Sequence, residues 1–464
     1  MLLMNNERIG KLTTRIGELE AMLETLQAEV ATLRTENAML RARLEDKTPP
    51  TAPPAFVKAN KPTQESKEPR KKRDSKHNRA RRREQATRHE TRRLESCPDC
   101  GDRLAASRPY YKRQVIDIPE PVQAEVVEIQ VEKSWCARCR RYHWPAVDWK
   151  GVVDGRGRIG VRLMGLIGYL RTHLRLPVRL IQEYVHSLHG VRLSGGEISA
   201  LCQRLATRLT PEAEALKAAA RSSPVVHMDE TGWREDGRNG YIWCLVTDVP
   251  QPVRYYEFHF SRAGAVATTL LGEFNGFLVS DFYAGYNAYS GAHQRCWVHL
   301  LRDLRDLRLA HADNGAVIAW ARAVELLYRT AVAPSAEATE GMTDVPRQLY
   351  DRLWQQANVL GLQYAQAKAH PCQALAKRVL RHIDELFQFL RCSELHPDNN
   401  LAERSLRPLV VQRKVSGGSR SPAGSKTRMT LASLFATWHA RKQNELFTCW
   451  NLLGYQLTPM SGFI

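Results

Sequence analysis

Three acidic residues far apart in the chain have the chemistry and the surroundings of divalent-metal ligands. Asp229 follows the apolar run 224–228, Asp281 ends the run 277–281, and Glu403 lies in Asp398-Asn-Asn-Leu-Ala-Glu403. Carboxylate oxygens are ligands that Mg2+ prefers, and two such ions about 3.5–4 Å apart can act on the attacking and leaving oxygens of a phosphodiester. Two ions need a bridging carboxylate and flanking ones. We therefore predict that the three acids form one catalytic site for two Mg2+ ions, with Mn2+ as a substitute.

The segments around these acids predict an α/β core. The first strand is expected to end at Asp229, with a turn directly after it, and residues 239–247 and 253–260 are rich in β-branched and aromatic residues, as strands are. A helix over about 262–274 then leads to the strand that ends at Asp281. Three strands, a helix and a strand, with acids on the first and fourth strands, are typical of a ribonuclease H-like nucleotidyl-transfer core.

Neighbouring acids compete for these positions. Glu230 adjoins Asp229, but successive side chains of a strand point to opposite faces, so only one of the two enters the site. Glu394 and Asp398 are the alternatives to Glu403 as the third ligand. Other nearby acids stand in polar contexts that favour solvation: Asp236, Asp303 and Asp306.

Basic residues and a Cys-x-x-His motif lie close to the acids. Four cations that follow Glu403 could clamp phosphates, or could be surface charges: Arg404, Arg407, Arg413 and Lys414. The motif Cys296-Trp297-Val-His299 resembles half a metal site. With no second pair nearby, we expect Cys296 and Trp297 to pack the end of the fifth strand. The alternative for His299 is that it positions DNA or orients a ligand.

Two Cys-x-x-Cys pairs predict a zinc-ribbon-like module. The pairs are Cys97 with Cys100 and Cys136 with Cys139, separated by strand-like stretches at 110–118 and 122–133. Four thiolates complete the tetrahedral shell of a structural Zn2+ and leave no open position. His143 is a possible substitute ligand, and a surface position is the alternative for it.

Residues 9–44 follow a heptad repeat. Leucine at every d position and mostly β-branched residues at a favour a parallel two-stranded coiled coil, and a single Asn37 at a fixes its register. A lone amphipathic helix is the alternative. The predicted dimer contacts are Leu12, Leu19, Leu26, Leu33, Asn37 and Leu40.

A basic arm follows the heptads. Lys and Arg number 68 against 49 Asp and Glu, a formal net charge of +19, which suggests a polyanionic partner such as nucleic acid. After the Pro-rich linker 48–69, an arm of basic residues could lie along DNA phosphates, serve as a solvated spacer or act as a nuclear-localisation signal. Its cations are Arg70, Lys71, Lys72, Arg73, Arg81, Arg82 and Arg83.

Residues 158–210 predict helices. One helix spans 178–189, and Ser194 caps a second with Glu197 at the capping-box position. The pair resembles a helix-turn-helix with Arg204 and Arg208 on its second helix, and an ordinary helical hairpin is the alternative. After Glu403 we expect a basic Gly/Ser loop over 409–426 and helices at about 427–442 and 444–454.

The predicted fold class is multidomain α+β. The expected parts are a parallel coiled coil (1–47), a disordered Pro-rich and then basic linker (48–93), a zinc-ribbon-like module (94–150), a helix-turn-helix-like domain (151–220), the first part of the core (221–300), a helical insertion (301–397) and the last part of the core with C-terminal helices (398–464). No run of about 18 apolar residues is present and no secretory signal is recognised, so neither a membrane span nor secretion is expected.

Four motifs resemble the acidic-triad signatures of bacterial insertion sequence 66 family transposases. They are Asp229-Glu-Thr-Gly-Trp233, Ser280-Asp281-Phe-Tyr-Ala-Gly-Tyr286, Cys296-Trp-Val-His299 and Asn399-Asn-Leu-Ala-Glu403-Arg-Ser-Leu-Arg-Pro408. The heptads and the four cysteines extend the likeness over nearly the whole chain. One departure is Val415-Ser-Gly-Gly418, where related sequences usually carry an aromatic-rich stretch.

The resemblance implies a DNA transposase with Asp229, Asp281 and Glu403 as its metal-binding triad. It also implies that the substrate DNA is the terminal inverted repeats of the element, with small accessory proteins encoded beside the gene. We expect a homodimer, larger on DNA, in the bacterial cytoplasm and associated with the nucleoid. The alternatives are a ribonuclease H-like nuclease that cuts without joining and a non-catalytic zinc-containing DNA-binding regulator.

Overall fold

A computed structural model describes residues 89–106 and 121–456, apart from 156 and 334–344, together with scattered residues at 17–33, 85–86 and 113–116. The chain forms two compact units, Met1–Asp117 and Ile118–Ile464, and each is considered by itself. The basic arm and most of the heptad lie outside the described residues, including Leu12, Leu19, Asn37 and Leu40. The heptad residues that are described, among them Leu26 and Leu33, are helical and exposed.

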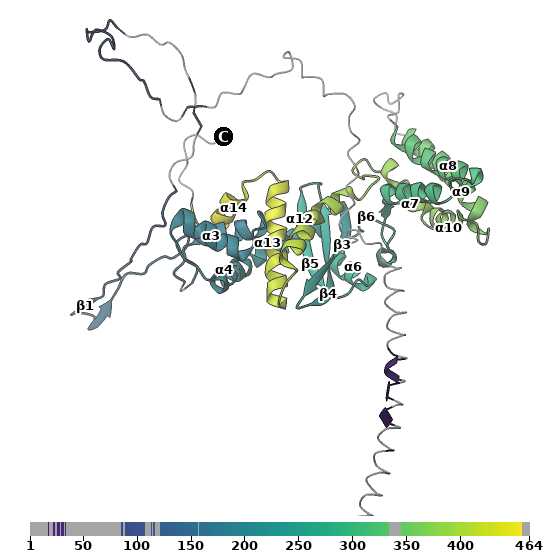
Figure 1. Cartoon of the computed structure of the whole chain (residues 1–464), viewed down its shortest axis with the longest axis horizontal. Helices are drawn as coiled ribbons and strands as arrows, with labels where there is room; N and C mark the ends of the chain where they lie inside the picture. The colour runs from purple at the N-terminus through teal and green to yellow at the C-terminus, as the bar shows by residue number, and fades with distance from the viewer. Residues whose placement is uncertain are drawn as a thin grey trace, which may run out of the picture. The chain divides into compact units, whose positions relative to one another are not determined.

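The described part of the second unit contains a five-stranded sheet in the order β5-β4-β3-β6-β7 (Figure 1). Its strands are β3 (Val225–Glu235), β4 (Arg238–Thr247), β5 (Val253–His259), β6 (Phe277–Ser280) and β7 (His293–Arg295). β3 pairs antiparallel with β4 but parallel with β6, and β7 is also parallel to β6. Antiparallel neighbours need only short turns, whereas the parallel step from β5 to β6 crosses over through helix α6 (Gly264–Leu271).

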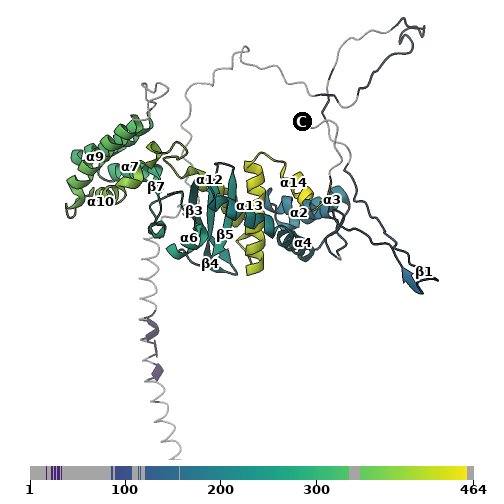
Figure 2. The same ribbon diagram turned by 180° about the vertical axis from the view of Figure 1, so that it is seen from behind.

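Helices cover both faces of this sheet (Figures 1 and 2). On one face, α12 (Asn400–Ser416) and α13 (Pro422–Ala440) bury Leu406 and Met429 against Trp233 and Cys244. On the other face, α5 (Thr210–Arg221) and α6 pack against Met228 and Trp243. Along each of these two strands, β3 and β4, successive side chains therefore enter two different cores in turn.

A second body of helices follows β7. It consists of α7 (Trp297–Ala310), α8 (Gly315–Val332), α9 (Val345–Ala365), α10 (Gln373–Arg381), α11 (Ile383–Leu386) and the 3-10 helix η3 (Gln388–Leu390). The helices bury their own core, which includes Trp297, Trp320 and Phe387. The chain then returns to the sheet at α12, so these helices stand between β7 and the helix that carries Glu403.

The helices before the sheet contain the predicted capping box. Besides α5, they are α2 (Val161–Thr172), α3 (Val178–His189) and α4 (Gly195–Arg208). The Ser194 side chain accepts a hydrogen bond from the backbone N–H of Glu197, and the Glu197 side chain accepts one from the backbone N–H of Ser194. This exchange satisfies two donors that the start of α4 would otherwise leave unpaired, and α3 ends at Gly190, which adopts a left-handed conformation.

Three segment predictions are wrong. The stretch 122–133 forms no strand, and the hairpin of the second cysteine pair begins only at Ser134. β3 does not turn after Asp229 but continues to Glu235, because its antiparallel pairing with β4 runs from His227 to Glu235 and buries Trp233. The predicted loop over 409–426 is also wrong. Helix α12 passes through Pro408 and ends only at Ser416, since Leu409 and Gln412 are buried on its inner side. Helix α13 then begins at Pro422.

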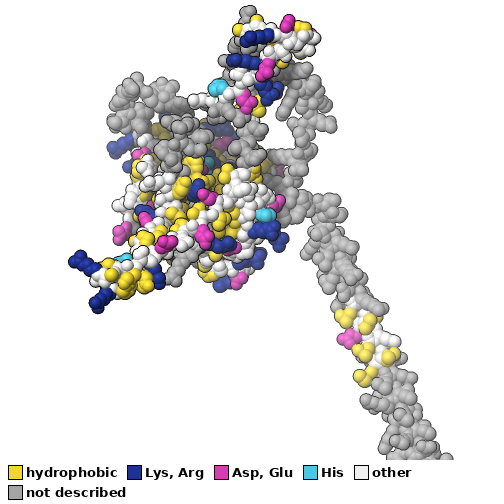
Figure 3. Space-filling view, turned by 90° about the vertical axis from the view of Figure 1, so that its left-hand side faces the viewer, with side chains coloured by type: hydrophobic (Ala, Val, Ile, Leu, Met, Phe, Trp, Pro, Cys, Tyr) yellow, Lys and Arg dark blue, Asp and Glu magenta, His cyan; other side chains and the backbone are white. Residues whose placement is uncertain are grey.

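The described helices include none that is long and apolar enough to cross a membrane. Figure 3 shows one face of the structure, where hydrophobic side chains gather toward the middle and Lys and Arg side chains lie mainly around them.

Candidate active site

Asp229 and Asp281 occupy matching positions on neighbouring parallel strands. The last pair between β3 and β6 is His227 with Val279, and each aspartate follows two residues later. Side chains in matching register on parallel neighbours lie side by side on the same face of the sheet. The Asp229 carboxylate accepts a hydrogen bond from the N–H of Glu230 (2.9 Å), and the Asp281 carboxylate accepts one from the N–H of Tyr283 (2.9 Å).

Glu403 lies in the first turn of α12, which covers the Asp229 face of the sheet. Asp281 and Glu403 both lie close enough to Asp229 to repel its negative charge. Burial, followed by repulsion from Glu230, Asp281 and Glu403, raises the pKa of Asp229 to about 8. Among the described residues, neither Asp229 nor Asp281 has a cationic side chain within salt-bridge distance. The negative charge of the cluster is therefore only weakly compensated by the protein.

One oxygen of Glu403 is left without a hydrogen-bond partner. Oε1 is buried and accepts no hydrogen bond from the described residues; the Nε2 atom of His299 lies 3.7 Å away. A buried carboxylate oxygen without a donor is costly unless a cation or water completes it. The unpaired oxygen of Glu403 and the crowding of acids that raises the pKa of Asp229 both fit a site for divalent cations.

Asn399, which directly precedes α12, ties that helix to β3. Its side-chain amide donates to the backbone oxygen of Met228 (2.7 Å), and its side-chain oxygen lies 3.2 Å from Nδ1 of His227. Its backbone N–H donates to Sγ of Cys296 (3.2 Å). Asn399 is 1% exposed, so these bonds are shielded from water. The residue fixes the start of the Glu403 helix beside the residue that precedes Asp229. The sequence contained the Asn-Asn pair but gave no indication of these partners.

Glu230 points to the other face of the sheet, as the alternation predicted. Arg262 donates to its carboxylate through Nε at 2.7 Å, and the Tyr286 hydroxyl also donates to it. Burial raises the pKa of Glu230, although the hydrogen bonds from Tyr286 and Arg262 oppose that shift. Since its oxygens are already occupied, Glu230 has a structural role. Neither Arg262 nor Tyr286 could be assigned this role from spacing.

The Cys-x-x-His motif directly follows β7 and forms the start of α7. Cys296 and Trp297 are fully buried at the end of β7, as predicted, and the backbone N–H of Cys296 donates to Ser280 (2.9 Å). His299 stands in the first turn of α7, and the possible ligand atoms of Cys296, His299 and Glu403 lie within 4.8 Å of one another. Burial raises the pKa of Cys296 to about 11, which disfavours a thiolate there. His299 is therefore the member of this motif that can act on Glu403.

The other nearby acids are bonded to other residues, and the basic residues of α12 are either bonded to β3 or exposed. Asp303 is paired with Arg378 and Asp306 with Arg305, while the Asp398 carboxylate accepts from the N–H of Asn400. Arg413 donates to the backbone oxygen of Gly232, so it is engaged by β3. The exposed cations of this helix are Arg404, Arg407 and Lys414.

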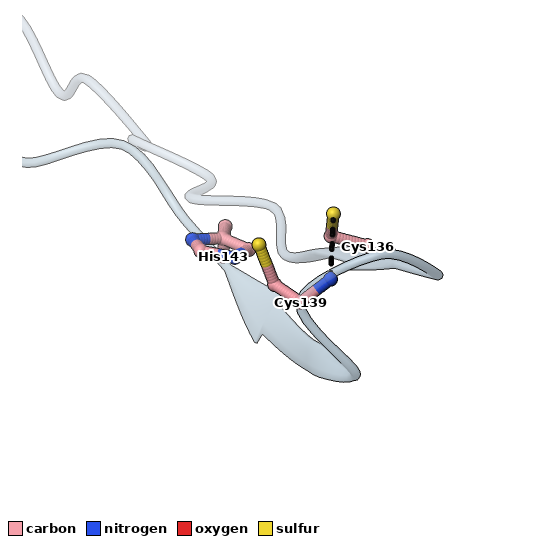
Figure 4. A group of neighbouring side chains, drawn as sticks. All are labelled: Cys136, Cys139 and His143. Atoms are coloured by element: carbon pink, nitrogen blue, oxygen red, sulfur yellow. Dashed lines mark hydrogen bonds between the residues drawn. The ribbon is translucent and has the colours of Figure 1, made fainter.

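The two cysteine pairs belong to different units. In the first unit, backbone hydrogen bonds from Cys100 and Asp99 lower the pKa of the Cys97 thiol. In the second unit, Cys136 and Cys139 stand in a hairpin of β1 (Ser134–Cys136) and β2 (Arg141–His143). The N–H of Cys139 donates to Sγ of Cys136 (3.4 Å) and lowers its pKa (Figure 4).

His143 faces the same hairpin cysteines. The ligand atoms of Cys136, Cys139 and His143 lie within 4.8 Å of one another, and Figure 4 shows the three side chains gathered at the hairpin. Sulfur and imidazole nitrogen are the donors that Zn2+ prefers, so this group fits a zinc site.

Two models of known protein families match this chain. A model of the family described as "Transposase IS66 family" matches residues 156–427, and one described as "zinc-finger binding domain of transposase IS66" matches residues 95–140. A transposase is a DNA-processing enzyme, and the zinc-finger match supports a Zn2+ site. Because the first match covers more than half of the chain, the protein belongs to the IS66 family of transposases.

Two proteins from Sinorhizobium fredii are also similar to this chain. The uncharacterized protein y4qI is 24% identical over 286 residues, which are 55% of this chain and 52% of that protein. The uncharacterized protein y4jD is 27% identical over 282 residues, which are 54% of each. The chain thus spans about half the length of the curated relatives it matches.

Proposed function

We propose that this protein is a transposase that cuts DNA at the ends of its own insertion sequence and joins those ends to target DNA. The proposal is supported by the matching register of Asp229 and Asp281 beside the pairing of β3 with β6, and by the electrostatic effect of both Asp281 and Glu403 on Asp229. The strand order, with antiparallel β4 and parallel β6 on either side of β3, supports a ribonuclease H-like core. The family match supplies DNA as the substrate.

Asp229, Asp281 and Glu403 would hold two Mg2+ ions, or Mn2+ in their place. When bound, such ions supply charge stabilisation and activation of the attacking water or 3′-hydroxyl. The unpaired Oε1 of Glu403 and the neighbouring carboxylates of the two strands are the protein's donors.

The chain's own residues prepare and position this donor set. Burial and the neighbouring acids keep a proton on the Asp229 carboxyl near neutral pH until a cation displaces it. Asn399 holds the start of α12 against β3, so that Glu403 is placed before DNA arrives. His299 Nε2, at 3.7 Å from Glu403, limits the directions that this carboxylate can take. Such positioning accounts for a large part of catalysis in phosphoryl transfer.

The reaction consists of one phosphodiester hydrolysis and one exchange of phosphodiesters, and neither step needs an external energy source. In the first step, water attacks a phosphorus atom at the element end, one P–O bond forms, another breaks, and a 3′-hydroxyl leaves. In the second step, that hydroxyl attacks a target phosphodiester, and the target strand's 3′-oxygen leaves. Each step forms one phosphorus–oxygen bond and breaks one. Because water and then the 3′-hydroxyl attack phosphorus directly, no covalent protein–DNA intermediate is required.

The remaining parts of the proposal concern assembly and DNA binding. The N-terminal heptads would make the protein a homodimer, and Cys97, Cys100, Cys136 and Cys139 would bind one structural Zn2+. Exposed cations of α12, Arg404 and Arg407 among them, would contact phosphates near the triad. Small accessory transposition proteins would act with the dimer.

A cutting and joining assay tests the proposal. Purified protein is incubated with labelled DNA from the flanks of its gene and with supercoiled plasmid, in Mg2+ or Mn2+, beside Asp229→Asn and Glu403→Gln. We expect metal-dependent cutting at the repeats and joined product, both lost in the two variants. Cutting without joining would replace the transposase with a nuclease. Binding without chemistry, even with the neighbouring gene products added, would indicate a regulator.

A further inference from the structure

A second cluster of possible metal ligands lies away from the acidic triad, at the C-terminal helix. It consists of His173, His439 and Glu445, whose ligand atoms all lie within 4.8 Å of one another. Oε1 of Glu445 is 2.6 Å from Nδ1 of His439 and 3.7 Å from Nε2 of His173. The two imidazole rings have their centres 5.2 Å apart. One carboxylate oxygen thus stands between two imidazole nitrogens.

Three elements that are distant in sequence bring these side chains together. His173 follows the last residue of α2, where its ring stacks on Tyr169, and His439 lies in the last turn of α13. Glu445 begins α14 (Glu445–Leu452). The connection from α13 to α14 turns sharply at Lys442, which has a φ of 58°. Asn444 then caps α14 by accepting from the N–H of Phe447 (3.0 Å). The turn directs Glu445 back onto His439.

Two side chains of the cluster are largely buried, and the third is exposed to solvent. The side chains of Glu445 and His173 are 14% and 23% exposed, while that of His439 is 70% exposed. Two partners are therefore held by packing, and the third stands at the surface, where an ion can enter. The two histidines also line a cavity of about 510 Å³, which has room for a water or a small anion beside them.

We propose that His173, His439 and Glu445 form a binding site for a divalent transition-metal ion of the Zn2+ type, which fastens α14 to α2 and α13. Two imidazoles and one carboxylate are a donor set that binds zinc, with a water completing four ligands. Ligand atoms about 2.0–2.1 Å from zinc at tetrahedral angles lie about 3.3 Å apart. The separations of 2.6 and 3.7 Å from the Glu445 oxygen fall on either side of that value, and all three ligand atoms lie within 4.8 Å of one another.

The competing explanation is a hydrogen-bonded cluster that needs no metal. His439 and Glu445 alone make an ordinary imidazole–carboxylate contact, as His259 and Glu257 do on β5 at 2.9 Å. The two arrangements differ in the third donor. His173 gives the C-terminal cluster a second imidazole directed at the same oxygen, whereas the other oxygen of Glu257 is occupied by Lys217 at 2.7 Å. The His259 pair therefore supplies a matched control.

Calorimetric titration of the full-length protein with Zn2+ tests the proposal. The protein is used with its cysteine-bound zinc, and millimolar Mg2+ is present to occupy the acidic triad. We expect one further equivalent of Zn2+ to bind the wild type and His259→Gln. In His439→Gln the affinity should fall at least about tenfold, the lower limit for losing even an indirect contributor to a metal site. Since His439 is mostly exposed, this replacement leaves the fold intact.

A second readout is the thermal stability of the protein. Zn2+ should raise the unfolding temperature of the wild type and of His259→Gln, and this increase should be lost in His439→Gln and Glu445→Gln, because an ion that binds only the folded state stabilises it. Equal Zn2+ stoichiometry and affinity in the wild type and in His439→Gln would overturn the proposal. So would the absence of the further equivalent in the wild type.

Discussion

The side-chain amide of Asn399 donates a 2.7 Å hydrogen bond to the backbone oxygen of Met228, the residue that precedes Asp229. Asn399 also directly precedes α12, and its own backbone oxygen accepts from the N–H of Glu403 (3.2 Å). A single buried side chain therefore joins the strand of the first acid to the helix of the third. Glu403 follows Asp229 by 174 positions, so this link cannot be read from local sequence.

Replacement of Asn399 by Ala should lower both stability and activity. It would leave the Met228 oxygen buried without a donor, which costs about 1–3 kcal/mol, and would free the start of α12. We expect DNA cutting to fall roughly 10- to 100-fold, as for residues that orient metal ligands. Urea unfolding and single-turnover cutting measure the two effects. Asn400→Ala is the control, and an equal loss in both variants would contradict a specific role for Asn399.

Asp229 and Glu230 should respond differently to neutralisation. Asp229→Asn removes a triad ligand, so metal-dependent cutting should drop at least about 1000-fold while DNA binding persists. Glu230→Gln weakens the contact with Arg262 on the opposite face and should chiefly reduce the unfolding free energy. Cutting rates and binding isotherms of both variants are compared. An inactive, fully folded Glu230→Gln beside an active Asp229→Asn would reverse the assignment.

Stability should decline as pH falls through the weakly acidic range, in part because of His293. Burial lowers the pKa of this histidine from 6.5 to about 3, so the unfolded chain takes up a proton that the folded chain refuses. Its contribution is complete above pH 6.5 and is lost progressively down to pH 3. Between pH 7 and 5 the loss is about 2 kcal/mol for this residue.

The His293→Gln variant should flatten that pH dependence. Buried His227, with a pKa lowered to about 4 by burial, acts in the same direction and should leave a residual slope. Urea unfolding from pH 7 to pH 5 measures the effect, and His186→Gln, at an exposed position, serves as the control. An unchanged slope in His293→Gln would rule out the assigned protonation.

Zinc content distinguishes the ligand sets of the N-terminal module. With four cysteine ligands, Cys97→Ser and Cys136→Ser should each lose the bound zinc, whereas His143→Gln should keep it. The proximity of His143 to Cys136 and Cys139 makes this comparison necessary. Metal analysis of the purified variants gives the answer. Loss of zinc in His143→Gln together with its retention in Cys97→Ser would replace the four-cysteine set.

Much of the core could be predicted because its segments carry strong local signals. The β-branched and aromatic residues of β4 and β5 and the Ser194–Glu197 capping box specify their structures within a few residues. The predicted strand is shorter than β3 because Gly232 has a low preference for strands, yet its pairing with Tyr241 keeps it extended. That pairing is a tertiary effect which no local pattern contains.

The partners within the site were less predictable than the acids. Burial of Leu409 and Gln412 carries α12 past Pro408, where local chemistry favours a break. Arg262 and Tyr286 meet Glu230 only because α6 and the loop after β6 pack on one face of the sheet. Residue types and motifs therefore indicated the candidate ligands, while the contacts that orient them depend on the three-dimensional packing.

The central claim is that Asp229, Asp281 and Glu403 share one divalent-metal site. Electron paramagnetic resonance of Mn2+ titrated into the wild type and into Asp229→Asn, Asp281→Asn and Glu403→Gln tests it most directly. We predict that the wild type binds Mn2+ at this site and that each of the three substitutions weakens that same bound signal. Binding by all three variants that matches the wild type would contradict the shared site and, with it, the proposed catalytic centre.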